Sequence, residues 1–247
     1  MNIFFIVLYQ PLFNLLVWLY DVVPGNDIGF AIIALTVIIR LALLPMSGQS
    51  LKSQKAMQDL QPKVNEIKAR TKDQKEQQAK ELMELYKTEK VNPLASCLPL
   101  IVQLVILLAL YQVLSAGLNS GSLEALYSFV PNPGRLDPVF LNKVDLTVPN
   151  ITLAILAGIV QYVQAKMMIT NRPPKAVAGQ AGSKDEAMMA TMNKSMLYLM
   201  PVMTVVIGAS LPGGLALYWL ISNLFMVGQQ WVVFRKKNKD VGYANRS

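Results

Sequence analysis

Five long apolar segments without a single acidic residue constrain the fold of this chain more than any other feature. A helix that crosses a hydrocarbon core of about 30 Å needs roughly 20 predominantly apolar residues. Five segments approach that length: 28–46, 93–118, 151–168, 195–211 and 213–234. Charged residues make up 15% of the chain, against about 25% in a typical soluble domain, which excludes an ordinary soluble enzyme. We therefore expect an all-α polytopic membrane protein with five transmembrane helices.

The basic residues are concentrated in three segments. Residues 47–92 hold ten Lys and Arg, residues 169–194 hold four and residues 235–247 hold five, whereas residues 1–27 hold none. With five spans, all three basic segments fall on one side, and the positive-inside rule makes that side the cytoplasm. We expect a multi-pass protein of a plasma (inner) membrane, bacterial because no organellar transit peptide is visible, with the N-terminus outside and the C-terminus in the cytoplasm.

Residues 1–27 are apolar and carry no basic residue, so they lack the basic n-region of a secretory signal peptide. A sixth span is one interpretation. The other is an interfacial helix from about Pro11 to Val23, with Trp18 and Tyr20 at the membrane surface. We expect the interfacial helix.

Residues 47–92 combine high charge with apolar residues at helical spacing, such as Met57, Leu60 and Val64. The pattern predicts a cytoplasmic hairpin of two antiparallel helices, and the alternative is a solvated charged loop. Thr71 and Gln74 fit a capping box that would start the second helix. The remaining expected divisions are an external loop over 119–150, a cytoplasmic loop over 169–194 and a basic cytoplasmic tail over 235–247.

Arg40 lies inside the first apolar segment. The twelve apolar residues before it reach only about 18 Å, which is short of the hydrocarbon thickness. The helix should therefore continue to about Pro45 or Met46, with the guanidinium in the cytoplasmic half of the membrane. Two interpretations remain: the side chain snorkels to the headgroups, or it faces a water-filled cavity that opens to the cytoplasm.

Other polar residues at similar depth favour the cavity, although Gln and Asn also hold membrane helices together. None of the five segments contains Asp or Glu, so an intramembrane arginine would attract an incoming carboxylate. The expected substrate-binding groove consists of Arg40, Thr36, Gln103, Gln161, Gln164, Trp219, Ser222 and Asn223.

Histidine is absent and Cys97 is the single cysteine. Histidine-dependent catalytic triads and histidine metal sites are therefore excluded, and no phosphate-binding loop is present. We expect no catalytic residues, no metal, no cofactor and no enzymatic activity.

Several motifs keep the order found in a known family. They include Thr36 to Leu41 with Leu44-Pro45, Asn92-Pro93-Leu94, Cys97-Leu98-Pro99 with Gln103, and Leu211 to Leu215 with Tyr218-Trp219, Asn223 and Gln229-Gln230. In these residues the chain resembles the YidC family of membrane protein insertases. The resemblance implies five core spans, a cytoplasmic helical hairpin and an N-terminal interfacial helix. It also implies a hydrophilic groove that is open to the cytoplasm and lipid and closed outside. The groove arginine would attract the polar or acidic N-tail of a nascent membrane protein.

By position, Arg40 corresponds to the groove arginine, and Gln103, Gln161 and Trp219 to groove residues. We expect a short form without the large periplasmic domain and without a long C-terminal extension. The expected partners are nascent membrane proteins, the lipid bilayer, the ribosome through the basic segments and, as a further candidate, the Sec translocon, but not DNA. The rival functions are a small-anion transporter or channel and a passive scaffold for membrane helices.

Overall fold

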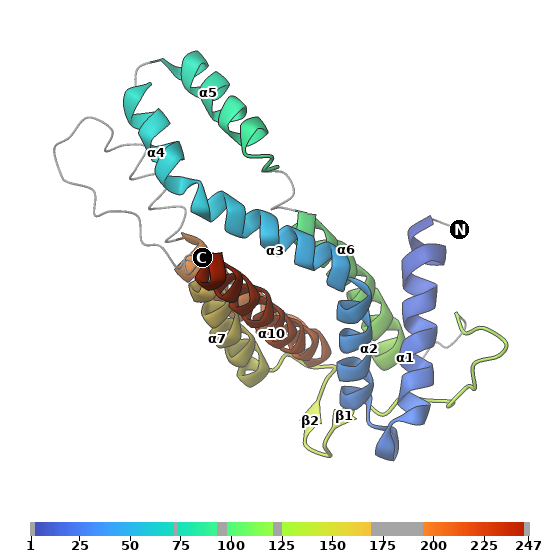
Figure 1. The fold of residues 1–247 in the computed structure, drawn as a ribbon. Helices are drawn as coiled ribbons and strands as arrows, with labels where there is room; N and C mark the ends of the chain where they lie inside the picture. Colours follow the sequence, from blue (N-terminus) through green and yellow to red (C-terminus); the bar gives the residue numbers. More distant parts are fainter. Residues whose placement is uncertain (1–2, 72–73, 93–97, 121–124, 169–194, 245–247) are drawn as a thin grey trace.

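The computed structural model describes residues 3–71, 74–92, 98–120, 125–168 and 195–244 of the chain, and most of them are helical (Figure 1). The cytoplasmic loop expected over 169–194 and the start of the second expected span, residues 93–97, lie outside the described residues. The helices are α1 (Gln10–Val22, preceded by a π-helical turn at Phe5–Tyr9), α2 (Ile28–Ala42), α3 (Leu44–Asp59), α4 (Gln61–Arg70), α5 (Lys75–Thr88), α6 (Leu98–Leu114), α7 (Ile151–Met168), α9 (Met200–Gly208, preceded by a π-helical turn at Ser195–Leu199) and α10 (Gly213–Ala244).

The first expected span, 28–46, is not one straight helix. α2 ends at Ala42, and α3 starts at Leu44 with its axis bent by 65°. The Leu43 amide still bonds to the Ile39 carbonyl at 3.0 Å, but Pro45 has no amide hydrogen to continue the ladder and occupies the first turn of α3. The expectation of a helix running through to Met46 is therefore wrong, and Arg40 lies in the last turn of α2.

The N-terminal helix is longer than the expected one, which ran from about Pro11 to Val23. Phe5–Val22 forms a continuous helical stretch of 18 residues that is long and apolar enough to cross a membrane. The chain reverses at Pro24–Asn26, where Gly25 has φ 75°, and α1 then lies alongside α2 (Figure 1). Phe13, Leu16 and Val17 of α1 are fully buried. α1 therefore packs into the helical bundle, and its length and apolar character fit a span as well as an interfacial helix.

The apolar core lies between α1, α2, α6 and α10. Phe13, Leu35, Leu110, Val113 and Tyr218 are all at most 2% exposed within it. α10 packs against α2 on one side and α7 on another, and α9 packs on α7. α10 is thus the helix that joins the two parts of the bundle. It continues as one helix to Ala244, so most of the expected tail is a helical extension of α10.

Residues 125–150 cover one end of the bundle and contain a short antiparallel ribbon of β1 (Val139–Phe140) and β2 (Val144–Asp145), which corrects the all-α expectation. Backbone amides of Gly213 and Gly214 bond to the carbonyls of Val148 and Leu146 at 2.9 and 3.0 Å. A Cβ on Gly213 would lie 3.1 Å from the Val148 oxygen. The Leu211 to Gly214 turn therefore lets this segment close tightly over the start of α10.

Asp27 joins the same segment to α2. Its Oδ1 accepts hydrogen bonds from the Gly29 and Phe30 amides at 2.7 and 3.4 Å, which caps α2. Its Oδ2 accepts from the Leu141 amide at 2.7 Å. One carboxylate thus stabilises the helix start and holds the β-ribbon against it.

Replacing Asp27 with alanine should lower the free energy of unfolding by about 1–2 kcal/mol, because it removes the cap and leaves the Leu141 amide without this acceptor. The expected readout is a lower apparent Tm in detergent. Asp21→Ala at the end of α1 is the matched control and should leave the Tm unchanged or raise it, because it removes a negative charge from a helix C-terminus. Equal losses in both variants would contradict this role of Asp27.

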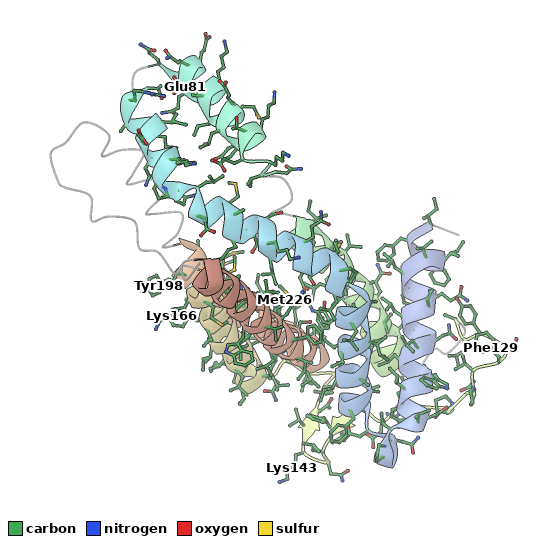
Figure 2. The ribbon with its side chains drawn as sticks, in the orientation of Figure 1. Glu81, Phe129, Lys143, Lys166, Tyr198 and Met226 are labelled. Atoms are coloured by element: carbon green, nitrogen blue, oxygen red, sulfur yellow. The ribbon has the colours of Figure 1, made fainter. Side chains whose placement is uncertain are left out.

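The helical arm, residues 44–88, extends from the end of α2 away from the β-ribbon, as Figure 2 shows with Glu81 and Lys143 at opposite ends of the molecule. α4 and α5 contact each other, and Arg70 bonds to Glu81 at 2.6 Å across the pair. The prediction of a capping box at Thr71 is wrong. The Thr71 hydroxyl donates to the Ile67 carbonyl at 2.7 Å, so Thr71 lies at the end of α4 and does not cap the start of α5.

Candidate functional site

Arg40 meets two other helices at the end of α2. Its Nη2 donates to Oε1 of Gln103 on α6 at 2.5 Å. Nε2 of Gln103 in turn donates to the hydroxyl oxygen of Tyr218 on α10 at 3.1 Å. Arg40, Gln103 and Tyr218, which we call the arginine cluster, therefore link α2, α6 and α10 through side chains only.

The positive charge in this cluster is not neutralised. In the part of the chain that the structure describes, the ion pairs are Lys63–Glu89 and Arg70–Glu81, and both lie in or beside the helical arm. Gln103 is a neutral acceptor and uses one of the five donors of the guanidinium. The cluster thus orients Arg40 without satisfying its charge.

Two buried oxygens extend the polar character along α10. Ser222 lies one turn after Tyr218, and Gln230 lies two turns further on; they are 0% and 1% exposed. Among the described residues, Gln230 Oε1 has no hydrogen-bond partner, and Ser222 Oγ has none apart from the Tyr218 hydroxyl beside it. A buried polar atom without a partner is destabilising by about 1–3 kcal/mol, so this face of α10 is suited to water or to a polar guest.

A second polar link joins α3 to α10. The Ser47 and Gln229 side chains exchange hydrogen bonds at 2.8 and 3.0 Å, and Gln229 also donates to the Leu44 carbonyl at 3.5 Å. Both side chains are buried. This link fixes the bend after α2 against α10, one turn beyond Arg40.

Two of the expected groove residues lie on the other side of α10. The Thr204 hydroxyl on α9 donates to Gln161 Oε1 on α7. Asn223 Nδ2 donates to the Ala157 carbonyl on α7 at 3.2 Å. The structure therefore uses Gln161 and Asn223 to join helices, and it does not bring them to Arg40.

The remaining expected residues are placed as follows. Thr36 is 1% exposed and its hydroxyl donates to the Ile32 carbonyl of its own helix at 2.6 Å, so it offers no free donor to a groove. Gln164 on α7 and Trp219 on α10 are half-buried. Of the eight expected residues, the arginine cluster contains Arg40 and Gln103, and Ser222 lies next to it on α10.

The expected groove did not include Tyr218, Ser47 and Gln229, although Tyr218 and Gln229 belong to the motifs that carry the family resemblance. Tyr218 and Ser222 are four residues apart and therefore share a helix face. A tyrosine inside an apolar helix needs a partner for its hydroxyl, which is the signal that could have identified it.

Replacing Tyr218 with phenylalanine should leave the fold intact and remove the acceptor of Gln103. The loss of one hydrogen bond, about 1 kcal/mol, should lower the apparent Tm in detergent by about 2–4 °C. Tyr111→Phe on the exposed face of α6 is the control and should leave the Tm unchanged. An unchanged Tm in Tyr218→Phe would contradict the stabilising role of the Tyr218 hydroxyl.

Most of this chain is similar to known proteins. The family described as 60Kd inner membrane protein matches residues 18–240. A relative from Fusobacterium nucleatum, named membrane protein insertase YidC, is 36% identical over 87% of this chain and 90% of its own length. A relative from Halalkalibacterium halodurans, membrane protein insertase YidC 1, is 35% identical over 90% of this chain and 76% of its own.

Other relatives are longer. The YidC insertase of Cupriavidus necator is 35% identical over 94% of this chain, which spans 36% of that protein. A crystal structure described as an active YidC insertase with its first transmembrane domain resolved matches with a TM-score of 0.60 and 25% identity. That match covers 92% of this chain and 46% of the solved chain.

The comparisons confirm the resemblance carried by the sequence motifs and the predominantly helical fold. The family match extends over more than half of the chain, and the Fusobacterium relative is matched over nearly all of its length. The chain belongs to the YidC family of membrane protein insertases.

Proposed function

We propose that this protein is an insertase and chaperone of a bacterial inner membrane, which inserts nascent membrane proteins into the lipid bilayer. The observation that carries the proposal is a charged Arg40 held between three helices by a neutral amide instead of a carboxylate. Relatives of similar length bear the name membrane protein insertase YidC. No cofactor, metal or covalent chemistry is needed, because the work is to lower the barrier for moving a polar segment across the membrane.

Arg40 would attract the polar or acidic N-tail of the substrate. At an effective dielectric constant of about 20, a carboxylate about 4 Å from the guanidinium is attracted by about 4 kcal/mol before desolvation. The carboxylate would replace Gln103 as the acceptor, while Tyr218 keeps the Gln103 amide in place. The attraction is large enough to recruit a tail and small enough to release it.

The distribution of charge supports one orientation in the membrane. The basic segments 47–92, 169–194 and 235–247 would lie in the cytoplasm, and residues 125–150 outside. Because α1 packs along α2, we propose that α1 also crosses the membrane, in addition to the five core spans. The residues before Phe5 would then lie on the cytoplasmic side, in place of the external N-terminus expected from the sequence.

The groove would be closed on the outside and open toward lipid. The Gly213 and Gly214 hydrogen bonds hold the segment of the β-ribbon over the outer start of α10. Apolar side chains of α6, such as Leu104 and Leu108, are exposed on the surface of the bundle, as are Val202 and Val206 of α9. These faces are suited to an apolar substrate helix that slides into lipid while its tail crosses.

We assign Arg40, Gln103, Trp219 and Ser222 to the groove. Two features support this assignment: the charged Arg40 is held by a neutral amide, and the buried Ser222 hydroxyl lies beside Tyr218 on α10. The ribosome, through the basic segments, and the Sec translocon are proposed as partners. The nascent membrane protein and the bilayer follow from the family function.

Purified protein in liposomes tests the proposal. Wild type should insert a single-span substrate with an acidic N-tail well above the level of empty liposomes. Flux of a small anion that is abolished in Arg40→Ala, without insertion, would favour a channel or transporter instead. If the protein supports neither insertion nor anion flux, the result would favour a scaffold.

A further inference from the structure

An open cleft of about 1160 Å³ separates α3 from the second half of α10. It is slightly larger than the roughly 300–1,000 Å³ of typical small-molecule pockets. Its walls are mainly apolar and include Leu44, Phe225, Val232 and Val233. Gln229 of the buried Ser47–Gln229 link is one of its lining residues. Neither the arginine cluster nor the expected groove residues line this cleft.

The cleft extends from the middle of the membrane to its cytoplasmic surface in the orientation proposed above. Measured along α10 from Gly213, Phe225 lies about 18 Å away and Phe234 about 31 Å away. The hydrocarbon core is about 30 Å thick. The apolar walls therefore lie in the inner half of the bilayer, and the mouth lies at headgroup depth.

Two lysines line the mouth of the cleft, at its cytoplasmic end. Lys52 and Lys55 are three residues apart on α3, so they share a helix face. The Lys55 ammonium lies 5.4 Å from the centroid of the Phe234 ring, which holds it over the cleft. Among the described residues that line the cleft, none is Asp or Glu. The mouth is thus positive while the interior is apolar.

We propose that this cleft binds one anionic phospholipid of the cytoplasmic leaflet, with its phosphate at Lys52 and Lys55 and an acyl chain between α3 and α10. An acyl chain needs no hydrogen-bonding partner along its length, and the walls offer almost none. A peptide in the same place would leave backbone amides and carbonyls against apolar side chains, which is unfavourable. The charge and the depth of the site both match a lipid with a negative headgroup.

The lipid would support the joint between α2 and the helical arm. Leu44 and Gly48 of α3 and Gly228 of α10 line opposite sides of the cleft. A chain between them would fill the space beyond the Ser47–Gln229 link and limit the approach of α3 to α10. This inference rests on the proposed membrane orientation and not on the insertase activity, so the two can fail separately.

Native mass spectrometry of the full-length protein, extracted from vesicles of equal phosphatidylglycerol and phosphatidylcholine, tests the inference. Wild type should retain one phosphatidylglycerol in clear excess over phosphatidylcholine. Lys52→Gln with Lys55→Gln should lower that excess about tenfold, and Lys52→Arg with Lys55→Arg should preserve it. Lys80→Gln with Lys87→Gln on α5 is the matched control and should behave like wild type.

A second variant fills the cleft without touching the charges. A Cβ on Gly228 meets no heavy atom within 4 Å, so Gly228→Phe should fold normally and displace the acyl chain. Bound lipid should be lost in this variant, whereas Val163→Phe on the exposed face of α7 should retain it. Equal retention of both lipids in wild type would overturn the proposal. So would displacement of the bound lipid by soluble glycerol phosphate, or retention of lipid in Gly228→Phe.

Discussion

Insertion of a single-span substrate with an acidic N-tail should fall at least tenfold when Arg40 is replaced by alanine, and should remain near wild type with lysine. Alanine removes the cation that bonds to α6 through Gln103, and the attraction to a carboxylate disappears with it. Lysine keeps the charge but not the planar geometry, so it should recruit the tail with a modest loss. Reconstituted liposomes with a protease-protection readout measure the three rates.

Lys166→Ala provides the control for this experiment. Lys166 is exposed at the end of α7 and belongs to no ion pair among the described residues. Its removal should leave insertion unchanged, and the apparent Tm of both alanine variants should stay close to wild type. If Arg40→Ala inserts the substrate as fast as wild type, Arg40 snorkels or supports structure, and the groove mechanism must depend on other residues.

Replacing Gly158 with leucine should destabilise the protein more than any other single substitution considered above. Gly158 of α7 is buried against α9, where an added Cβ would overlap Val205 and lie 3.1 Å from the Pro201 carbonyl oxygen. Because a backbone atom blocks the space, the helices must separate, and we expect a loss of about 3 kcal/mol. The apparent Tm in detergent should fall by about 6–12 °C.

Gly228→Leu is the matched control, because it makes the same chemical change in a helix where nothing lies within 4 Å of the new Cβ. Its Tm should be unchanged or slightly higher, since leucine favours helix more than glycine does. A Gly158→Leu protein as stable as wild type would contradict the close packing of α7 on α9.

The apolar segments and the basic segments could be read from the sequence because each depends on composition within one stretch of chain. The bend at Leu43 could not be predicted from the sequence, even though Pro45 lies two residues after it. A proline can begin a new helix or kink an old one, and here the Ser47–Gln229 link to α10 decides between them. Such a contact joins residues 182 positions apart, so no local pattern contains it.

The sequence left α1 open between an interfacial helix and a sixth span for a related reason. Its residues are apolar on nearly every face, which suits both the membrane interface and the membrane interior. The packing of Phe13 and Leu16 against the neighbouring helices is tertiary, so no local pattern contains it.

The candidate site was predicted in part. Arg40 and Gln103 were both expected in the groove, but their hydrogen bond depends on how α2 and α6 are aligned. Thr36 and Gln161 carry equally polar side chains, yet each is satisfied within its own helix or by a neighbouring one. Polar residue type therefore predicted that these side chains form hydrogen bonds. Only the fold determined that the charge of Arg40 is held by a neutral amide and remains available to a carboxylate.

The dependence of insertion on the charge of the substrate tail tests the central claim most directly. A series of single-span substrates would carry zero, one, two or three acidic residues in otherwise identical N-tails. We predict that insertion by the wild-type protein rises with each added carboxylate and that this dependence disappears in Arg40→Ala. An equal dependence in both proteins would contradict the role of Arg40 as the attractive charge in the groove.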